Sequence, residues 1–274
     1  MDIRDAIEFG VSTLSNRVPR PRLESEILLS SILHRDRIYL FLNPSVPLSN
    51  REKEIYIQYL QRRREGEPIE YITNRVSFYN HHFFIDKGAL IPRPETEILV
   101  DKVLEAISNI PNPKILEIGT GSGAVAISIA IERKDSYILA VDISNQALQV
   151  AKKNIELFQV SNIEIRKSNL FQNIQSSEEF DIIFSNPPYI SVSEKDKLQR
   201  ELDYEPDIAL FGGERGDEVL KNIIDKFFIR NEKVLICEMG YNQRDEVARY
   251  VDGRGRLDFY KDFAKLDRGF ILKK

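Results

Sequence analysis

The chain has 274 residues, of which 42% are apolar and 30% charged, so it can bury a full core and is neither disordered nor fibrous. Its net charge of −4 gives no general attraction to nucleic acid or to an anionic membrane. The single cysteine, Cys237, excludes an intrachain disulfide and a zinc site built from thiolates, and the sequence shows neither a signal peptide nor a membrane span. These features favour a reducing cytoplasm.

Residues 1–74 carry a helical pattern with few strand signals. Pro21 suits the first position of a helix, and apolar residues over 27–33 recur three and four apart. Ser49 and Glu52 have the spacing of a capping box at the start of another helix. The basic run Arg62–Arg64 fits either a solvated helix end or a contact with phosphate or a partner. We predict a small helical-bundle domain over residues 1–74.

The pattern changes after residue 74. Aromatic and β-branched residues flank Asn80 and His81, which predicts a β-hairpin or a pair of short strands in a connector over residues 75–94. His81 and His82 are neighbours that face opposite ways on a strand, and His34 is far away in the sequence. We therefore expect no metal site.

Residues 95–274 alternate between apolar runs and helical patterns. Helices are predicted at Ala124–Glu132 and Asn145–Phe158. The predicted strands are Lys114–Ile118, Tyr137–Val141, Ile163–Arg166, Asp181–Ser185 and Val234–Glu238, followed by Arg256–Tyr260 and Gly269–Leu272. The first strands alternate with helices, which indicates a mainly parallel Rossmann-like sheet, whereas the last two form an antiparallel hairpin at its edge. The predicted fold class is therefore α/β.

A glycine-rich loop follows the first strand of this sheet. Gly119, Gly121 and Gly123 alternate with Thr120 and Ser122, so the backbone can turn sharply and approach a ligand closely. The third glycine comes one residue too early for a dinucleotide fingerprint, and no Lys-Ser/Thr pair follows as in a P-loop. By itself the loop also fits an ordinary turn between a strand and a helix.

An acidic residue, Asp142, ends the next predicted strand. Its carboxylate can accept two hydrogen bonds from ribose hydroxyls, or it can cap the helix that starts near Ser144. Together with the glycine loop, it has the layout of a nucleoside-binding α/β fold. Because the loop is too short to favour a pyrophosphate, we expect S-adenosylmethionine as the ligand, with Glu117 near the positively charged end of that cofactor.

The sequence Asn186-Pro187-Pro188-Tyr189 follows the fourth predicted strand. An amide or aromatic-amine nitrogen is a poor nucleophile because its lone pair is delocalised. The side-chain oxygen of Asn186 and the carbonyl of Pro187 can each accept one N–H of a planar NH₂ group, which aims the lone pair at a methyl donor. The prolines fix φ and remove a competing donor, and Tyr189 can pack on a flat substrate group. The alternative is a proline-rich turn without chemistry.

The glycine loop, Asp142 and the Asn-Pro-Pro-Tyr tetrad resemble those of class I S-adenosylmethionine-dependent amino-methyltransferases. Nearly the whole chain resembles the release-factor glutamine N5-methyltransferases; the further stretches that carry this resemblance are Arg22–Leu29, Gly66–Ile72, Leu90–Glu97 and Tyr204–Pro206. The resemblance implies methylation of the glutamine side-chain amide in the Gly-Gly-Gln motif of peptide chain release factors. Because DNA adenine methyltransferases share the tetrad, a nucleic-acid amino-methyltransferase acting on adenine or guanine remains the alternative.

Several residue roles follow from the resemblance alone. It implies that residues 119–123, Asp142 and Asn186 bind the cofactor, and that residues 186–189 bind and orient the glutamine, with Asn186 and Pro187 as the catalytic groups. Asn169 and Leu170 fall where the family contacts adenine, although many members have Asp in place of Asn169. An amide oxygen can still accept from the adenine amino group, but without charge.

Two further segments lie close to these motifs. The resemblance implies that Arg93, Glu95 and Thr96 help to close the cofactor pocket, but they also suit a helix start. Glu238–Gly240 is interpreted as the structural end of a strand, with no chemical role. The helical domain is expected to recognise the release factor, with no stable binding of nucleic acid, and the resemblance implies a monomer.

Overall fold

The computed structural model describes all residues, 1–274, and they form two compact units. The first unit comprises Met1–Arg75 together with Gln199–Tyr204, and the second comprises Val76–Leu198 together with Glu205–Lys274. The connector expected over residues 75–94 belongs to the second unit, apart from its first residue. Nothing in the sequence pattern predicted that residues 199–204 belong with the amino-terminal helices.

The first unit is helical, as predicted from its periodicity. Its helices are α1 (Ile3–Leu14), α2 (Pro21–Leu33), α3 (Arg37–Leu42), α4 (Asn50–Arg64) and α5 (Ile69–Thr73), with the 3-10 segment η3 (Arg200–Tyr204). Pro21 is the first residue of α2, and Ser49 and Glu52 form the predicted capping box of α4. Leu28, Tyr56 and other apolar side chains of these helices form one buried core.

The basic run at the end of α4 is not a simply solvated helix end. The guanidinium of Arg63 is buried and pairs with the carboxylates of Glu24 and Glu201, while Arg62 pairs with Glu67. Both predicted explanations are therefore wrong for Arg63, whose partners are acids of this chain. Because Glu201 comes from the 199–204 segment, this ion pair helps to hold that segment against the helices.

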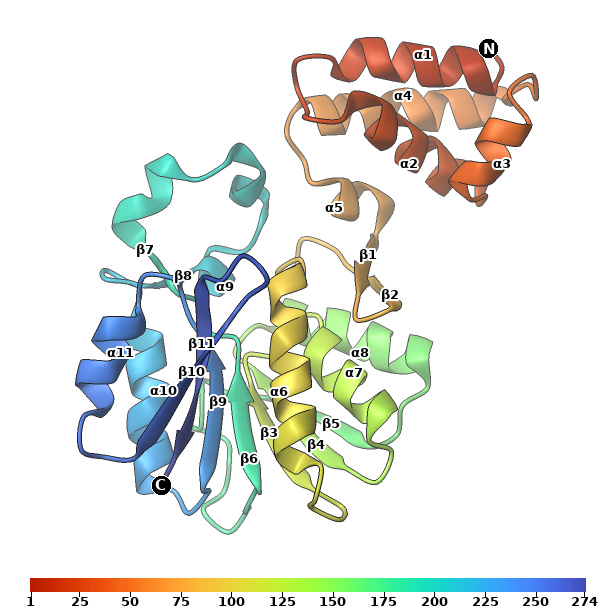
Figure 1. Cartoon of the computed structure of the whole chain (residues 1–274). Helices are drawn as coiled ribbons and strands as arrows, with labels where there is room; N and C mark the ends of the chain where they lie inside the picture. Colours follow the sequence, from red (N-terminus) through yellow and green to blue (C-terminus); the bar gives the residue numbers. More distant parts are fainter. The chain divides into compact units, whose positions relative to one another are not determined.

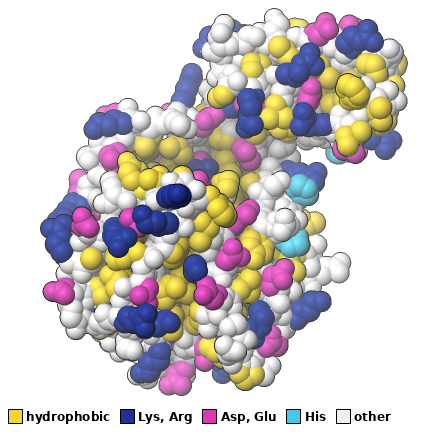
Figure 2. Space-filling model, in the orientation of Figure 1, with side chains coloured by type: hydrophobic (Ala, Val, Ile, Leu, Met, Phe, Trp, Pro, Cys, Tyr) yellow, Lys and Arg dark blue, Asp and Glu magenta, His cyan; other side chains and the backbone are white.

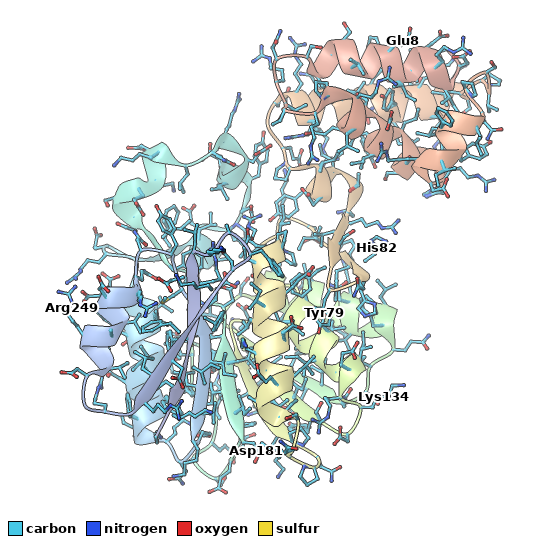
Figure 3. The ribbon with its side chains drawn as sticks, in the orientation of Figure 1. Glu8, Tyr79, His82, Lys134, Asp181 and Arg249 are labelled. Carbon is cyan, nitrogen blue, oxygen red and sulfur yellow. The ribbon has the colours of Figure 1, made fainter.

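The second unit begins with the predicted hairpin, formed by β1 (Arg75–Phe78) and β2 (His81–Phe84). Tyr79, in the turn between these strands, donates a hydrogen bond from Oη to Asp101 of α6 (Glu97–Ile107) at 2.8 Å (Figure 3). The backbone N–H of Tyr79 also donates to Glu97 at 2.9 Å. These bonds fix the hairpin on the helix that precedes the main sheet.

The main sheet has seven strands, and each of the strands predicted for it is present with small shifts at the ends. In chain order they are β3 (Lys114–Ile118), β4 (Tyr137–Asp142), β5 (Ile163–Lys167), β6 (Ile182–Ser185), β9 (Val234–Glu238), β10 (Arg256–Lys261) and β11 (Asp267–Lys273). Their spatial order is β10-β11-β9-β6-β3-β4-β5. Strands β5, β4, β3, β6 and β9 are parallel, and β10 and β11 form the predicted antiparallel hairpin at the edge.

Helices cover the sheet on both sides (Figure 1). The predicted helices α7 (Ala124–Glu132) and α8 (Asn145–Phe158) pack against each other, and α6 packs on α7. Helices α10 (Glu218–Ile229) and α11 (Arg244–Val251) share a separate core with the strands; among its members are Leu116, Val141, Ile183, Leu235, Phe227 and Val247. The remaining short elements are η1 (Pro94–Thr96), β7 (Ile190–Ser191), η2 (Val192–Lys197), α9 (Asp207–Leu210) and β8 (Phe211–Gly213).

The strand order sets the position of the functional loops. β3 lies between β4 and β6, and the chain leaves β3 toward β4 but reaches the other side only at β6. At such a reversal the loops after neighbouring parallel strands diverge, which leaves a crevice at the carboxyl ends of the strands. The glycine loop follows β3, Asp142 ends β4, and the Asn-Pro-Pro-Tyr tetrad follows β6. No helix of the chain is both long and apolar enough to cross a membrane.

Candidate active site

A cavity of about 340 Å³ lies at this crevice. Ten of the twelve residues that the sequence analysis singled out for the site line this cavity; they are Gly119, Thr120, Gly121, Ser122, Asp142, Asn169, Leu170, Asn186, Pro187 and Pro188. The other two, Gly123 and Tyr189, do not line it. The structure therefore brings together residues from the ends of β3, β4, β5 and β6, as the parallel sheet predicts.

The glycine loop has a backbone that only glycine adopts easily. Gly119, Gly121 and Gly123 have φ values of +76°, +57° and +79°. A Cβ added at Gly119 or Gly121 would meet no atom of the chain within 4 Å. The space beside these two residues is therefore open to a ligand. Gly123, in contrast, packs against α8, because its Cβ would lie 3.2 Å from the Cβ of Ala151.

Asp142 fixes the loop through its carboxylate. Its Oδ2 accepts from the backbone N–H of Gly121 at 2.9 Å, and its Oδ1 accepts from that of Ser144 at 2.8 Å. Ser144, rather than Asp142, is the N-cap of α8 and accepts from the N–H of Ala147. Because each carboxylate oxygen can accept more than one hydrogen bond, Asp142 retains acceptor capacity toward the cavity. Burial raises the pKa of Asp142, and the backbone donors oppose this shift.

Glu117 is a second carboxylate at the cavity and is fully buried. Its Oε2 accepts a short hydrogen bond from the hydroxyl of Thr120. The pKa of Glu117 is raised to about 8, mainly by burial; the hydrogen bond from Thr120 opposes this shift and the charge of Asp142 adds to it. A cationic group beside Glu117 would favour its ionised form.

The tetrad is held rigidly where it leaves β6. Ser185, the last residue of the strand, donates from Oγ to the carbonyl of Ile118 at 2.7 Å, which ties β6 to β3 just before the tetrad. The side-chain Nδ2 of Asn186 donates to the hydroxyl of Thr96 at 3.1 Å. No group of the chain donates to Oδ1 of Asn186 or to the carbonyl oxygen of Pro187. Both oxygens are therefore free to accept from a substrate.

Backbone packing holds the other end of the tetrad. Cβ atoms added at Gly212 and Gly216 would come within 2.5 Å of the Pro188 carbonyl and 2.6 Å of the Tyr189 carbonyl, respectively, so these positions exclude larger residues. Gln243 donates from Nε2 to the Tyr189 carbonyl at 3.2 Å. These contacts keep the tetrad in one backbone conformation.

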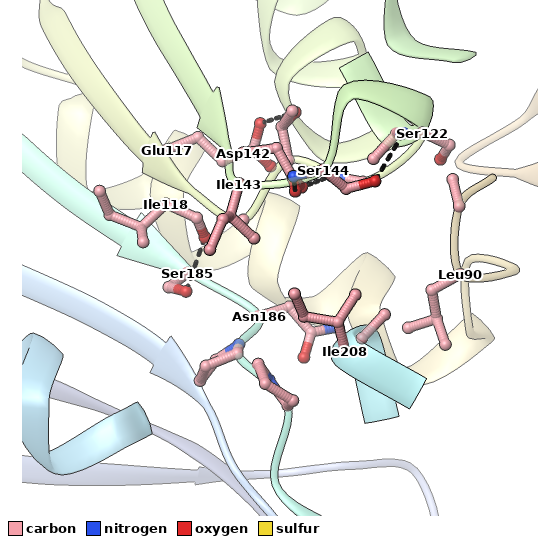
Figure 4. A pocket seen from close by; sticks show the side chains of 18 of the residues that line it. Leu90, Glu117, Ile118, Ser122, Asp142, Ile143, Ser144, Ser185, Asn186 and Ile208 are labelled. Carbon is pink, nitrogen blue, oxygen red and sulfur yellow. Dashed lines mark hydrogen bonds between the residues drawn. The ribbon is translucent and has the colours of Figure 1, made fainter. Parts of the chain in front are cut away.

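Apolar side chains form the wall opposite the glycine loop. Leu90 and Ile208 lie on one side of the cavity, and Asp142 and Glu117 lie on the other (Figure 4). The segment before α9 is joined to the one that carries Leu90 by the buried Glu205, which accepts from the backbone N–H of Ile91 at 3.0 Å and pairs with Arg93. Two of the stretches that carry the resemblance, Leu90–Glu97 and Tyr204–Pro206, thus meet at this wall through Glu205.

The end of the cavity near β5 contains the residues assigned to adenine. Asn169 is exposed, and Leu170 has a left-handed backbone with φ of +49°. The hydroxyl of Ser168 donates to the Leu170 carbonyl at 2.7 Å and holds this unusual conformation. Ile143, which follows Asp142, also lines the cavity and is exposed, although the sequence analysis did not single it out.

Glu238, which the sequence analysis interpreted as a structural strand end, also has hydrogen bonds to residues of the site. It ends β9, but its buried carboxylate contacts the site: Oε2 accepts from the Thr96 hydroxyl at 2.8 Å, and Oε1 accepts from the Tyr189 hydroxyl at 3.3 Å. Burial raises its pKa to about 7. Burial and the nearby charge of Glu238 raise the pKa of Tyr189 to about 12. An acid that ends an apolar strand was the available signal, the same one that identified Asp142.

Comparison with known proteins agrees with this architecture. The family model for the PrmC N-terminal domain matches residues 5–73, and the one for the methyltransferase small domain matches residues 94–202. The crystal structure of the hMettl16 catalytic domain in complex with MAT2A 3'UTR hairpin 6 shares the fold, with a TM-score of 0.59 and 15% identity over 84% of each chain. The protein is therefore a class I S-adenosylmethionine-dependent methyltransferase with a helical amino-terminal domain.

Similarity over the full length narrows this class. A release factor glutamine methyltransferase of Koribacter versatilis is 40% identical over 278 residues, covering 100% of this chain and 99% of the relative. One of Buchnera aphidicola is 33% identical over 278 residues and covers 100% of both chains. One of Clostridium acetobutylicum is 37% identical over 276 residues, covering 98% of this chain and 97% of the relative. This chain belongs to the release factor glutamine methyltransferase family.

Proposed function

We propose that this enzyme transfers the methyl group of S-adenosylmethionine to the side-chain amide nitrogen, N5, of the glutamine in the Gly-Gly-Gln motif of peptide chain release factors. The observation that carries the proposal is the position of two acceptors without a donor from the chain, Oδ1 of Asn186 and the Pro187 carbonyl, at the cavity that also contains the glycine loop and Asp142. The relatives described above are named release factor glutamine methyltransferases.

The cavity fits the cofactor. Open space beside Gly119 and Gly121 accommodates a ligand against the backbone, and Asp142 offers acceptors for ribose hydroxyls. Glu117 suits the positively charged part of the molecule because its carboxylate is buried among few other charges. When bound, S-adenosylmethionine supplies an electrophilic methyl group on a sulfonium.

The residues of the chain orient the acceptor. Asn186 and Pro187 each accept one N–H of the glutamine amide, so the nitrogen lone pair is directed away from the amide plane toward the methyl donor. The positive charge that develops on nitrogen strengthens both hydrogen bonds, which stabilises the transition state more than the ground state. The new N–C bond forms as the C–S bond breaks, and the methylated nitrogen then loses its extra proton to water. No side chain has to act as a strong base before the transfer.

The partner and the setting follow from this reaction. We propose that the enzyme acts as a monomer, as the resemblance to this family implies. The wall that Leu90 and Ile208 form is the part of the cavity where the glutamine arm would pack. Because release factors work on ribosomes, the proposed reaction takes place in the cytoplasm.

One assay tests this proposal. The purified enzyme is incubated with isotopically labelled S-adenosylmethionine and a purified release factor, without ribosomes or nucleic acid, and peptides are analysed by mass spectrometry. We expect one methyl group per factor, on the glutamine of Gly-Gly-Gln. Parallel reactions contain DNA or RNA as the acceptor; transfer to a base and not to the factor would replace the proposal with the nucleic-acid alternative. On the face that Figure 2 shows, Lys and Arg side chains are interspersed with Asp and Glu. The net charge of −4 also gives no general attraction to nucleic acid, which such an enzyme would need.

A further inference from the structure

A chain of two hydrogen bonds leads from a buried carboxylate to Asn186, and a third hydrogen bond joins the same carboxylate from Tyr189. Tyr189 and Thr96 donate to the two oxygens of Glu238, at 3.3 Å and 2.8 Å, and Asn186 donates from Nδ2 to Thr96 Oγ1 at 3.1 Å. Glu238 and Thr96 are both buried, so water does not supply substitutes for these partners. The chain connects β9, η1 and the loop after β6.

Counting protons gives this chain a direction. An ionised carboxylate only accepts hydrogen bonds, so both hydroxyls that face Glu238 must donate to it. The single proton of the Thr96 hydroxyl is thereby used, and Oγ1 can only accept from its other neighbour. Asn186 must therefore turn its NH₂ group toward Thr96, and its oxygen must lie on the other side.

We propose that Glu238 is a positioning residue that acts through Thr96 to fix which side of the Asn186 amide faces the substrate. This inference rests on the proposed function, because the orientation matters only for an acceptor that carries N–H groups. In the observed orientation Oδ1 is available to the glutamine NH₂. With the amide rotated by half a turn, Nδ2 would face the glutamine NH₂, and two donors would oppose each other.

A simple structural tie between β9 and η1 is the alternative explanation, and one substitution separates the two. Glu238→Gln keeps the volume and leaves a side chain that can hydrogen-bond Thr96. However, the new Nε2 can donate to Thr96 Oγ1, which frees the hydroxyl proton to point at Asn186. A structural tie survives this change in either orientation of the new amide, whereas the direction of the hydrogen bond at Thr96 is no longer fixed.

Kinetics with a release factor as substrate provide the first test. We expect Glu238→Gln and Thr96→Val to lower kcat by about 10- to 100-fold, as for loss of one oriented polar partner, with a cofactor Kd within about twofold of wild type. Thr96→Ser restores the hydroxyl and should recover most of the rate lost in Thr96→Val. Ser128→Ala is the matched control, because Ser128 is a fully buried hydroxyl that bonds only the carbonyl of Ala124. Its kcat should not change.

A second readout does not need catalysis. In ¹⁵N NMR spectra, the side-chain NH₂ signal of Asn186 is assigned by its loss in Asn186→Ser, and its hydrogen exchange is compared between variants. Slow exchange in wild type and Thr96→Ser, with fast exchange in Thr96→Val and Glu238→Gln, is the expected pattern. If wild type transfers no methyl group, the proposed function fails, and the NMR comparison still decides the orientation.

The following results would overturn the inference. One is a kcat of Glu238→Gln and Thr96→Val equal to that of wild type in an active enzyme. The other is exchange of the Asn186 NH₂ that does not differ among the variants. A loss of cofactor affinity with unchanged kcat would also contradict it, because that pattern assigns Thr96 to the cofactor pocket alone.

Discussion

Glu117 makes a quantitative prediction about cofactor binding. Its carboxyl group has a pKa of about 8 in the folded protein, because it is buried and lies near Asp142. At pH 7 such a group is protonated in about nine tenths of the molecules. A bound cofactor that places positive charge beside Glu117 favours the carboxylate, so binding should release about 0.9 protons per molecule at this pH.

The same linkage sets the pH dependence of the cofactor Kd. If only the ionised enzyme binds, the apparent Kd is multiplied by one plus the ratio of protonated to ionised Glu117. With a pKa of about 8, this factor is about 100 at pH 6 and about 11 at pH 7. Affinity should therefore rise about ninefold between pH 6 and pH 7. Glu117→Gln cannot ionise, and its Kd should be nearly constant over this interval.

Calorimetry in buffers of different ionisation enthalpy measures the proton release directly. S-adenosylhomocysteine keeps the ammonium group but has no sulfonium, and methylthioadenosine lacks both, so the three ligands separate the contributions of the two charges. Equal proton release by wild type and Glu117→Gln, or by methylthioadenosine and S-adenosylmethionine, would refute the reasoning. The titrating group would then lie elsewhere in the cavity.

Three further predictions concern other parts of the site. Asn186→Ala should lower kcat by about 100-fold and leave the cofactor Kd nearly unchanged, whereas Asp142→Ala should mainly weaken cofactor binding, as measured by calorimetry; exchanged phenotypes would contradict the assigned roles. Gly121→Ala and Gly253→Ala should each cost about 1–2 kcal/mol in denaturant unfolding, because both residues have positive φ and open space at Cβ, but only Gly121→Ala should weaken cofactor binding. Glu238 has a pKa of about 7 and faces Glu95, Tyr189, Tyr260 and Arg268. We expect kcat to fall as the pH drops below 7, because the protonated acid no longer sets the direction of its hydrogen bonds. A kcat that is constant from pH 6 to pH 8 would contradict this.

The elements that the sequence predicted well depend on local patterns. Ala124–Glu132 and Asn145–Phe158 were predicted with the observed bounds. The second segment combines apolar periodicity with a capping serine, Ser144, whereas the first is an apolar run that directly follows the glycine loop. The positions of the glycine loop, Asp142 and the tetrad followed from the rule that ligands bind at the carboxyl ends of parallel strands. Their detailed roles in binding remain predictions.

The features that were missed depend on contacts between distant residues. Thr96 and Glu238 lie 142 residues apart, and Arg63 and Glu201 lie 138 residues apart. No periodicity or spacing connects such pairs. The sequence therefore predicted either a solvated helix end or a contact with phosphate or a partner at Arg63, and it indicated only the strand end at Glu238. Arg63 and Glu238 are ionisable groups that are buried by contacts with segments distant in the sequence.

The 199–204 segment has a consequence for dividing this protein. Its two ends join the methyltransferase unit, yet it packs with the amino-terminal helices and supplies Glu201 to Arg63. The polypeptide therefore passes between the two units three times, and a single proteolytic cut near residue 75 leaves them connected through this segment's packing. A truncated protein that starts at residue 76 would also leave Glu201 without its partner Arg63. A stand-alone methyltransferase unit therefore needs the 199–204 segment shortened as well.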